Sequence, residues 1–218
     1  MKSAIRWGGL ILALVSAAQV HAVSVSYFMN QSNELADGPN YLQVTIDDNG
    51  APGSINFKVE TLPVLTGMAT GNFGLQSFGF NTTLSSGLIA SASISGLPAG
   101  WTANVAPRSN TRGGFGKFDI AVNDTGQNRA SVLTFSVTGI AGDTVLNYAK
   151  LSSGTAGEGN VFFAAHVAGF NDGNSATSAF FGGSTLVPLP GAVWLLGSGL
   201  LGLVAFARRK KNGFPPSV

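Results

Sequence analysis

Alternating apolar and polar residues mark two neighbouring strands in the first third of the chain. Residues 41–47 and 55–60 place apolar side chains at every second position, namely Leu42, Val44 and Ile46, then Ile55, Phe57 and Val59. A period of two is typical of a strand with one face in a core and the other in solvent. The intervening residues 48–54 are rich in turn formers, so they predict an antiparallel hairpin with a loop longer than two residues.

Further strand-like segments occur on both sides of this hairpin, with glycine and proline between them. They are residues 23–28, 75–81, 88–95, 101–106, 116–122, 132–137 and 161–167. Many short strands between turns are typical of layered antiparallel sheets. We therefore expect a mainly β fold: a single antiparallel β-sandwich, jelly-roll or Ig-like, over residues 23–186, of which 181–186 form a short spacer.

One short helix is expected at residues 144–151. Asp143 can accept hydrogen bonds as its N-cap, and Val145, Leu146 and Ala149 would share one face. No sequence repeat and no internal linker divides the β-rich region, which favours one domain.

The N-terminal end has the pattern of a signal peptide. Two cations precede an apolar run at residues 7–18, and Val20 and Ala22 have the small or modest size that signal peptidase accepts before a cut between Ala22 and Val23. The apolar run is shorter than the roughly 20 residues that span a bilayer. We therefore predict that residues 1–22 are a removable export signal.

The C-terminal end has three parts. In order, these are the motif Val187, Pro188, Leu189 and Pro190, an apolar segment that continues to residue 207, and the basic cluster Arg208, Arg209, Lys210 and Lys211. The prolines keep the motif extended. Residues 189–207 predict a transmembrane helix of about 27 Å, just enough for a hydrocarbon core of about 30 Å. By the positive-inside rule the cations stay in the cytoplasm, followed by residues 212–218 as a tail.

This order resembles the PEP-CTERM sorting signal in its Val-Pro-Leu-Pro-Ala form over residues 187–211, with Gly191 in place of the usual alanine. In that family exosortase, a membrane-embedded cysteine protease-transpeptidase of Gram-negative bacteria that make extracellular polysaccharide, processes the signal. The resemblance implies export by the secretory translocon and a transient inner-membrane anchor with the domain on the periplasmic side. Cleavage near residues 187–191 would then bring the domain to the cell surface or extracellular matrix. An ordinary membrane anchor explains the helix and cations but not the motif.

Composition changes the picture of possible partners. All ten acids but only six of the twelve lysines and arginines lie between the two end segments, which gives the middle region a net charge of −4. The overall basic balance therefore comes from the ends, and no nucleic-acid partner is expected. The chain has no cysteine, which removes disulfides and thiolate ligands, and we expect no cofactor.

A few residues outside the two ends could take part in chemistry. His166 is the single histidine left after signal cleavage, and we interpret it as a hydrogen-bonded structural residue. The oxygen-rich loops at residues 47–50 and 171–174 could hold calcium, but these residue types are also those of ordinary turns. A secreted hydrolase would need acids such as Asp119 and Asp124 to converge in a cleft.

Carbohydrate binding would need aromatic side chains presented to a sugar. Trp101, Phe115 and Phe118 could supply them, although Trp101 could equally close one end of the core. The leading hypothesis is a non-enzymatic surface or matrix protein associated with extracellular polysaccharide or biofilm. The alternatives are a carbohydrate-binding module for a specific glycan and, less favoured, a hydrolase.

Overall fold

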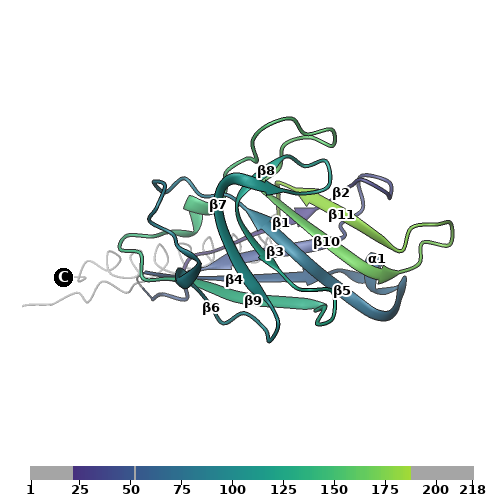
Figure 1. The fold of residues 1–218 in the computed structure, drawn as a ribbon, viewed down its shortest axis with the longest axis horizontal. Helices are drawn as coiled ribbons and strands as arrows, with labels where there is room; N and C mark the ends of the chain where they lie inside the picture. The colour runs from purple at the N-terminus through teal and green to yellow at the C-terminus, as the bar shows by residue number, and fades with distance from the viewer. Residues whose placement is uncertain (1–21, 52, 188–218) are drawn as a thin grey trace, which may run out of the picture.

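The computed structural model describes residues 22–51 and 53–187, which form two six-stranded antiparallel sheets (Figure 1). Sheet A has the order β12 (Thr185–Leu186), β1 (Ser24–Met29), β3 (Leu42–Asp47), β4 (Ser54–Thr61), β9 (Val132–Thr138) and β6 (Ile94–Ser95). Sheet B has the order β2 (Gln31–Ser32), β11 (Ser178–Gly183), β10 (Phe163–Phe170), β5 (Ala69–Phe80), β8 (Lys117–Asn123) and β7 (Thr102–Thr111). The short helical turns are α1 (Pro63–Thr66), η1 (Ser91–Ser93) and η2 (Val145–Tyr148). The predicted mainly β class with antiparallel sheets is confirmed.

The predicted hairpin is β3 and β4. They pair antiparallel from Leu42 opposite Thr61 to Asp47 opposite Asn56. The inward side chains of β3 and β4 are the apolar positions of the sequence pattern, and all of them are buried. The alternation of apolar and polar residues therefore predicted both strands and the face of each strand that packs in the core.

One aromatic-rich core lies between the two sheets. Phe57 of β4 stacks on Phe135 of β9, with ring centroids 4.8 Å apart and planes 6° apart. The same ring lies 4.8 Å from Phe80 of sheet B and 5.1 Å from Tyr148 of η2. Phe57 thus joins residues of both sheets, and aromatic pairs of this kind contribute beyond the area that they bury.

Two expected elements differ in the structure. Residues 88–95 do not form a full strand; they contain η1 and the two-residue strand β6. The helix expected at residues 144–151 is the single 3₁₀ turn η2, with Val145 and Tyr148 buried and Leu146 65% exposed. In a 3₁₀ turn, positions i and i+3 share a face. The Tyr148 hydroxyl also donates a hydrogen bond to Asp143 Oδ2 at 2.5 Å, which holds that side chain inward.

The expected spacer at residues 181–186 is instead part of both sheets, so that prediction is wrong. Phe181 of β11 pairs with Ala165 of β10 and is fully buried. In β12, Leu186 pairs with Tyr27 of β1. The folded domain therefore continues to the start of the predicted sorting motif.

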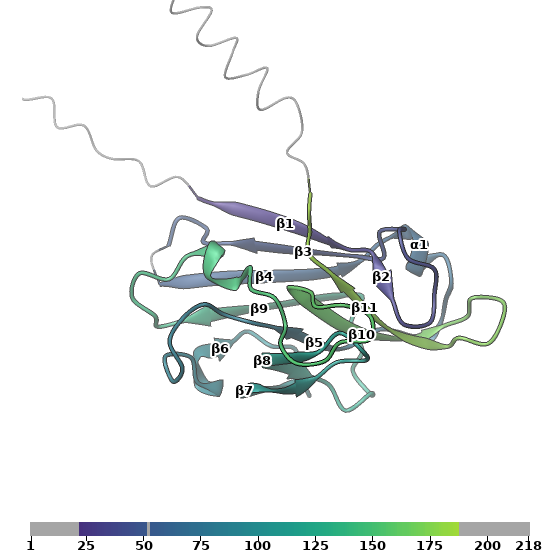
Figure 2. The same ribbon diagram turned by 90° about the horizontal axis from the view of Figure 1, so that it is seen from above.

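Both ends of the described chain belong to sheet A. The C-terminal end of the described chain, coloured yellow-green, reaches β1 in Figure 2. There β12 runs antiparallel to β1, and the Val187 backbone N–H donates to the Ser26 carbonyl oxygen at 2.9 Å. Across the described residues, no helix has the length and apolar character needed to cross a membrane. The predicted transmembrane helix at residues 189–207 lies outside those residues.

Candidate functional site

The three aromatic side chains that could have contacted a glycan are buried. Trp101 is 6% exposed, and Phe115 and Phe118 are fully enclosed. The Trp101 indole packs in the shared core, and its Nε1 donates a hydrogen bond to the Asn128 carbonyl oxygen at 2.9 Å. A ring without an open face cannot stack on a sugar, so the structure favours the alternative in which these side chains belong to the core.

Phe115 and Phe118 are buried because the loop after β7 covers part of the outer face of sheet B. A second small core contains Phe115, Phe118, Val161 and Ala164. A Cβ atom on Gly182 would lie 2.5 Å from the Phe115 ring, and one on Gly79 would lie 3.2 Å from the Phe118 ring. The glycines of the sheet therefore leave the space that the two rings fill.

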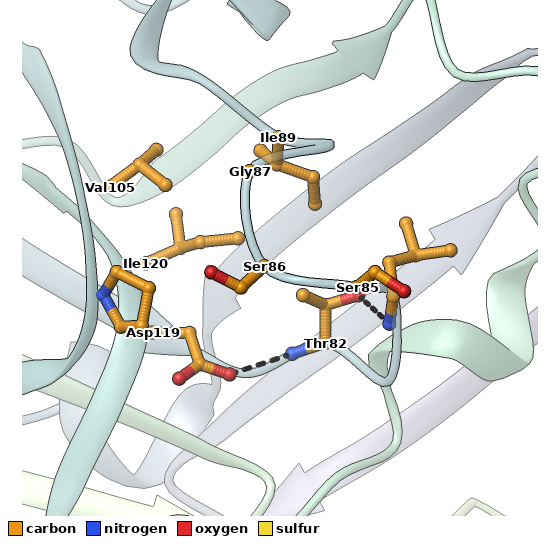
Figure 3. Close-up of a pocket in the computed structure, with 10 residues that line it drawn as sticks. Thr82, Ser85, Ser86, Gly87, Ile89, Val105, Asp119 and Ile120 are labelled. Atoms are coloured by element: carbon orange, nitrogen blue, oxygen red, sulfur yellow. Dashed lines mark hydrogen bonds between the residues drawn. The ribbon is translucent and has the colours of Figure 1, made fainter.

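A small cavity lies between strands β7 and β8 and the loop that follows β5 (Figure 3). Its lining combines apolar side chains such as Ile89 and Val105 with the hydroxyls of Thr82 and Ser86 and the carboxylate of Asp119. Its volume is ≈ 80 Å³. Because small-molecule pockets typically measure about 300–1,000 Å³, this cavity suits a few water molecules rather than a sugar ring.

Asp119, beside this cavity, links separate segments of the chain. Its Oδ1 accepts a hydrogen bond from the Arg108 backbone N–H at 3.1 Å, and its Oδ2 pairs with Lys150 Nζ at 3.1 Å. Lys150 Nζ also donates to the Thr82 carbonyl oxygen at 2.7 Å. The carboxylate is therefore engaged in holding the loop after β5 against β7 and β8.

The second acid of the hydrolase hypothesis, Asp124, stabilises its own turn. Its Oδ2 accepts hydrogen bonds from the backbone N–H groups of Gly126 at 2.7 Å and Asn128 at 3.0 Å. An acid–base pair must converge on a substrate. Asp119 and Asp124 are instead bound to different segments, so the structure gives both acids structural roles.

The two oxygen-rich loops form hydrogen-bonded turns. Asp48 Oδ1 accepts from the Gly50 backbone N–H at 3.0 Å, and Asp172 Oδ1 accepts from the Asn174 N–H at 2.9 Å. These backbone hydrogen bonds lower the pKa of each aspartate. Within residues 22–51 and 53–187, no group of three or more acidic or histidine side chains is placed to hold a metal ion.

His166 lies in a row of side chains that crosses four strands of sheet B. The register pairs Asn123 of β8 with Ser77 of β5, Ser77 with His166 of β10, and His166 with Phe180 of β11. The imidazole stacks on the Phe180 ring, with centroids 4.5 Å apart. An aromatic contact, rather than the expected hydrogen bond, thus positions His166.

Two arginines lie near His166. Arg112, in the loop after β7, donates from Nη2 to Asn123 Oδ1 at 2.7 Å, and Arg129, in the loop after β8, donates from Nη1 to the Asn72 carbonyl oxygen at 2.9 Å. Burial, followed by the positive charges of Arg129 and Arg112, lowers the pKa of His166. Burial also lowers the pKa of Arg112. We call Arg112, Arg129 and His166 the arginine site.

Neither arginine has a carboxylate partner in the part of the chain that the structure describes. The ion pairs there join Lys58 to Glu60 and Lys150 to Asp119. The Nε atoms of both arginines are buried without a hydrogen-bond partner. Because buried charges in proteins are normally paired, two half-buried guanidinium groups without an acid are the most unusual electrostatic feature of this domain.

Sequence reasoning missed both arginines. Arg112 and Arg129 belong to different loops, and nothing in their local sequence links either one to His166. The available signal was the separation of cations from acids: Arg108, Arg112 and Lys117 follow one another with no acid until Asp119. Only the strand register of sheet B brings the loops that carry the two arginines to the same histidine.

The outer face of sheet A is also polar, but its side chains bond to one another. Ser136 Oγ donates to Asn56 Oδ1 at 2.7 Å, and Asn56 Nδ2 donates to Asp47 Oδ1 at 3.2 Å. A shallow hollow of ≈ 520 Å³ covers this chain of hydrogen bonds. Because these groups already satisfy each other, a ligand would have to replace existing bonds there.

The two predicted processing sites adjoin the folded domain. The Val23 backbone N–H donates to Asp48 Oδ1 at 2.8 Å, and Val187 is bonded to Ser26 as described above. Residues 1–21 lie outside the described residues. So do Pro188, Leu189 and Pro190 of the sorting motif and the cations Arg208, Arg209, Lys210 and Lys211.

The contact between Val23 and Asp48 gives a testable prediction about signal cleavage. A cut after Ala22 would turn the Val23 amide into an ammonium group beside a carboxylate. We therefore expect Asp48→Asn to lower the melting temperature of the cleaved protein more than that of the uncleaved protein, measured by thermal unfolding in detergent. Since hydrogen bonding lowers the pKa of Asp48 in the folded state, its contribution is complete above the ordinary aspartate pKa. It disappears as the pH falls through the lowered value.

Asp172→Asn is the matched control, because Asp172 also has a pKa lowered by local hydrogen bonds but contacts Asn174 and Ala176 rather than the N-terminus. Its effect should be the same before and after signal cleavage. If signal cleavage changed the melting temperatures of both variants equally, there would be no stabilising contact between the Val23 ammonium group and Asp48.

Comparison of this chain with protein families, curated proteins and solved structures gives no significant match.

Proposed function

We propose that this chain is an exported surface or matrix protein, translocated by the secretory pathway and processed by exosortase. In this proposal its β domain has no catalytic role and associates with extracellular polysaccharide. The observation that carries the proposal is that the folded domain begins and ends beside the two predicted processing sites. β1 begins at Ser24, one residue after Val23, and β12 ends at Leu186, one residue before the sorting motif.

This placement fits removal of both end segments. Val23 and Val187 both attach to sheet A, at Asp48 and at Ser26 of β1. Cuts after Ala22 and at or after Val187 would leave in place every strand and every core residue that the structure describes. The domain would therefore keep its fold while it is tethered and after it is released.

The finer fold assignment is part of the same proposal. Two antiparallel sheets that share one core support a β-sandwich of the jelly-roll or Ig-like kind. A stable sandwich without a catalytic centre suits a protein that decorates or crosslinks a matrix. The structural roles of Asp119 and Asp124 support a non-enzymatic domain over a hydrolase.

Cell fractionation tests the sorting proposal. With exosortase present, we expect the domain at the surface or in the medium, and mass spectrometry of its C-terminus should end near residues 187–191. Without exosortase, the full-length chain should stay in the inner membrane. Pro188→Ala combined with Pro190→Ala should reproduce this retention, while Pro107→Ala, in β7 of the folded domain, should not. Full-length protein in the inner membrane under both conditions would contradict the proposal.

A further inference from the structure

We propose that the arginine site binds the acidic groups of a polysaccharide, either carboxylates or sulfate esters. The inference rests on the proposed function and deepens it, because it assigns the association with polysaccharide to a particular surface. That surface is the outer face of sheet B around Arg112, Arg129 and His166. It differs from the aromatic residues that the sequence suggested and from the polar face of sheet A.

The first argument is charge. Arg112 and Arg129 are half-buried and have no carboxylate within ion-pair distance among the described residues. The side chains in the same row, from Asn123, Ser77 and Phe180, are uncharged. Two acids lie in the adjoining loops. Asp124, in the same loop as Arg129, accepts the backbone N–H groups of Gly126 and Asn128, and Glu158 packs against Gly114. Neither forms an ion pair with Arg112 or Arg129. A bound anion would supply the missing partner.

The second argument is the supply of hydrogen-bond donors. Arg112 uses one hydrogen of Nη1 for the Thr111 carbonyl oxygen and one of Nη2 for Asn123. Arg129 uses Nη1 for Asn72. Each terminal nitrogen of a guanidinium carries two hydrogens, so further donors remain on both side chains. These hydrogen bonds hold the two guanidinium groups in place, which reduces the conformational entropy lost when they bind carboxylate or sulfate oxygens.

The third argument is where the charges lie on the domain. Five of its six cations lie on β7, on β8 or in the loops that follow β7, β8 and η2, namely Arg108, Arg112, Lys117, Arg129 and Lys150. The strands of sheet A carry Lys58, which pairs with Glu60. On the strands of sheet B the acid is Asp119, which Lys150 neutralises. From β7 through the loop after β8, residues 102–131 carry four cations and two acids, Asp119 and Asp124. This segment is therefore positive although the domain has a net charge of −4, which favours an acidic ligand.

The stack of His166 on Phe180 adds an apolar surface next to the two cations. Both rings are partly exposed, whereas Trp101, Phe115 and Phe118 are buried. Acidic sugars combine an apolar ring face with a charged group. A site with an aromatic edge beside guanidinium groups fits both parts.

Binding to immobilised polymers tests the site with the full chain in non-ionic detergent. The probes are polygalacturonate for carboxylates, dextran sulfate for sulfate esters and plain dextran as the neutral polymer. We expect retention on one or both acidic polymers, loss of retention at high salt, and none on dextran. Preference between the two acidic polymers identifies the group that the site takes. Equal retention on dextran would overturn the proposal.

Single substitutions distinguish binding by the arginine site from binding by the basic end segments, because the wild type and every variant keep the same end segments. Arg112→Gln and Arg129→Gln should each weaken binding about tenfold or more, since each removes charge-assisted hydrogen bonds. Lys58→Gln removes the same charge from sheet A and should bind like the wild type. Thermal unfolding shows whether each variant folds. If Arg112→Gln does not fold, the binding of Arg129→Gln still tests the site. Equal binding by the wild type and both arginine variants would overturn the proposal.

A direct readout comes from His166. The variant His21→Gln leaves His166 as the single histidine of the chain, so its ring resonances can be titrated by NMR without assignment. An anion bound between the arginines should raise the pKa of His166, because it offsets the positive charges that lower it. An unchanged pKa at saturating oligogalacturonate or sulfated oligosaccharide would place the anion elsewhere and overturn the proposal. Neither result depends on export or exosortase, which are tested in cells.

Discussion

Phe57→Ala is expected to lower the free energy of unfolding by about 3–5 kcal/mol, the usual cost of truncating a buried phenylalanine. The Phe57 ring is 2% exposed and stacks on Phe135 in its own sheet. It also contacts Phe80 of sheet B and Tyr148 of η2. These neighbours are held by separate strands, so they cannot collapse into the cavity that the substitution would leave.

Denaturant unfolding followed by tryptophan fluorescence measures this change, because Trp101 packs in the same core. Leu146→Ala is the control: this side chain is 65% exposed in η2, and its loss should cost less than about 0.5 kcal/mol. Similar destabilisation by both substitutions would argue against one core shared by the two sheets.

Gly183→Ala is the second substitution with a large expected effect, a loss of about 1–3 kcal/mol or more of stability. A Cβ at this position would overlap the Phe28 carbonyl oxygen and lie 2.5 Å from the Met29 Cα. These are backbone atoms of β1, so no side-chain rotation can relieve the overlap. The end of β11 and the strand β1 would have to separate, which would loosen the edge that leads to the sorting motif.

Thermal unfolding of the alanine variant, compared with Gly157→Ala, tests this prediction. Gly157 lies in a loop, and a Cβ there would meet no atom within 4 Å. Its substitution should leave the melting temperature nearly unchanged. If Gly183→Ala were equally harmless, residues 181–186 would behave as the short spacer that the sequence suggested rather than as paired strands.

The burial of the candidate aromatic residues and the formation of the arginine site both depend on the loop after β7. The sequence shows that Trp101, Phe115 and Phe118 lie among glycines and turn formers, which is compatible with exposed loops or with loops that fold over a sheet. For Phe115 and Phe118, Gly182 and Gly79 decide between these possibilities, because their missing side chains leave room for the two rings on the outer face of sheet B. Trp101 packs instead in the core between the sheets. The same loop then carries Arg112 to Asn123.

Local patterns determined the strands that have one wet face. The alternation in β3 and β4 needed no tertiary information, since side chains on successive residues of any strand point in opposite directions. The order of charged, apolar and turn-forming residues at the two ends likewise predicts export and sorting without a fold. These features depend on residues that are neighbours in the chain.

Only the tertiary structure decided that residues 181–186 are strands, that the candidate aromatic residues are internal, and that two distant arginines approach one histidine. Gly182 and Gly183 show no apolar alternation, and they pair with Ala164 and Phe163 because β10 lies beside them. The row from Asn123 to Phe180 exists only through the register of four strands. Pairing between distant segments depends on the packing of the whole domain, so the local sequence of each segment does not predict it.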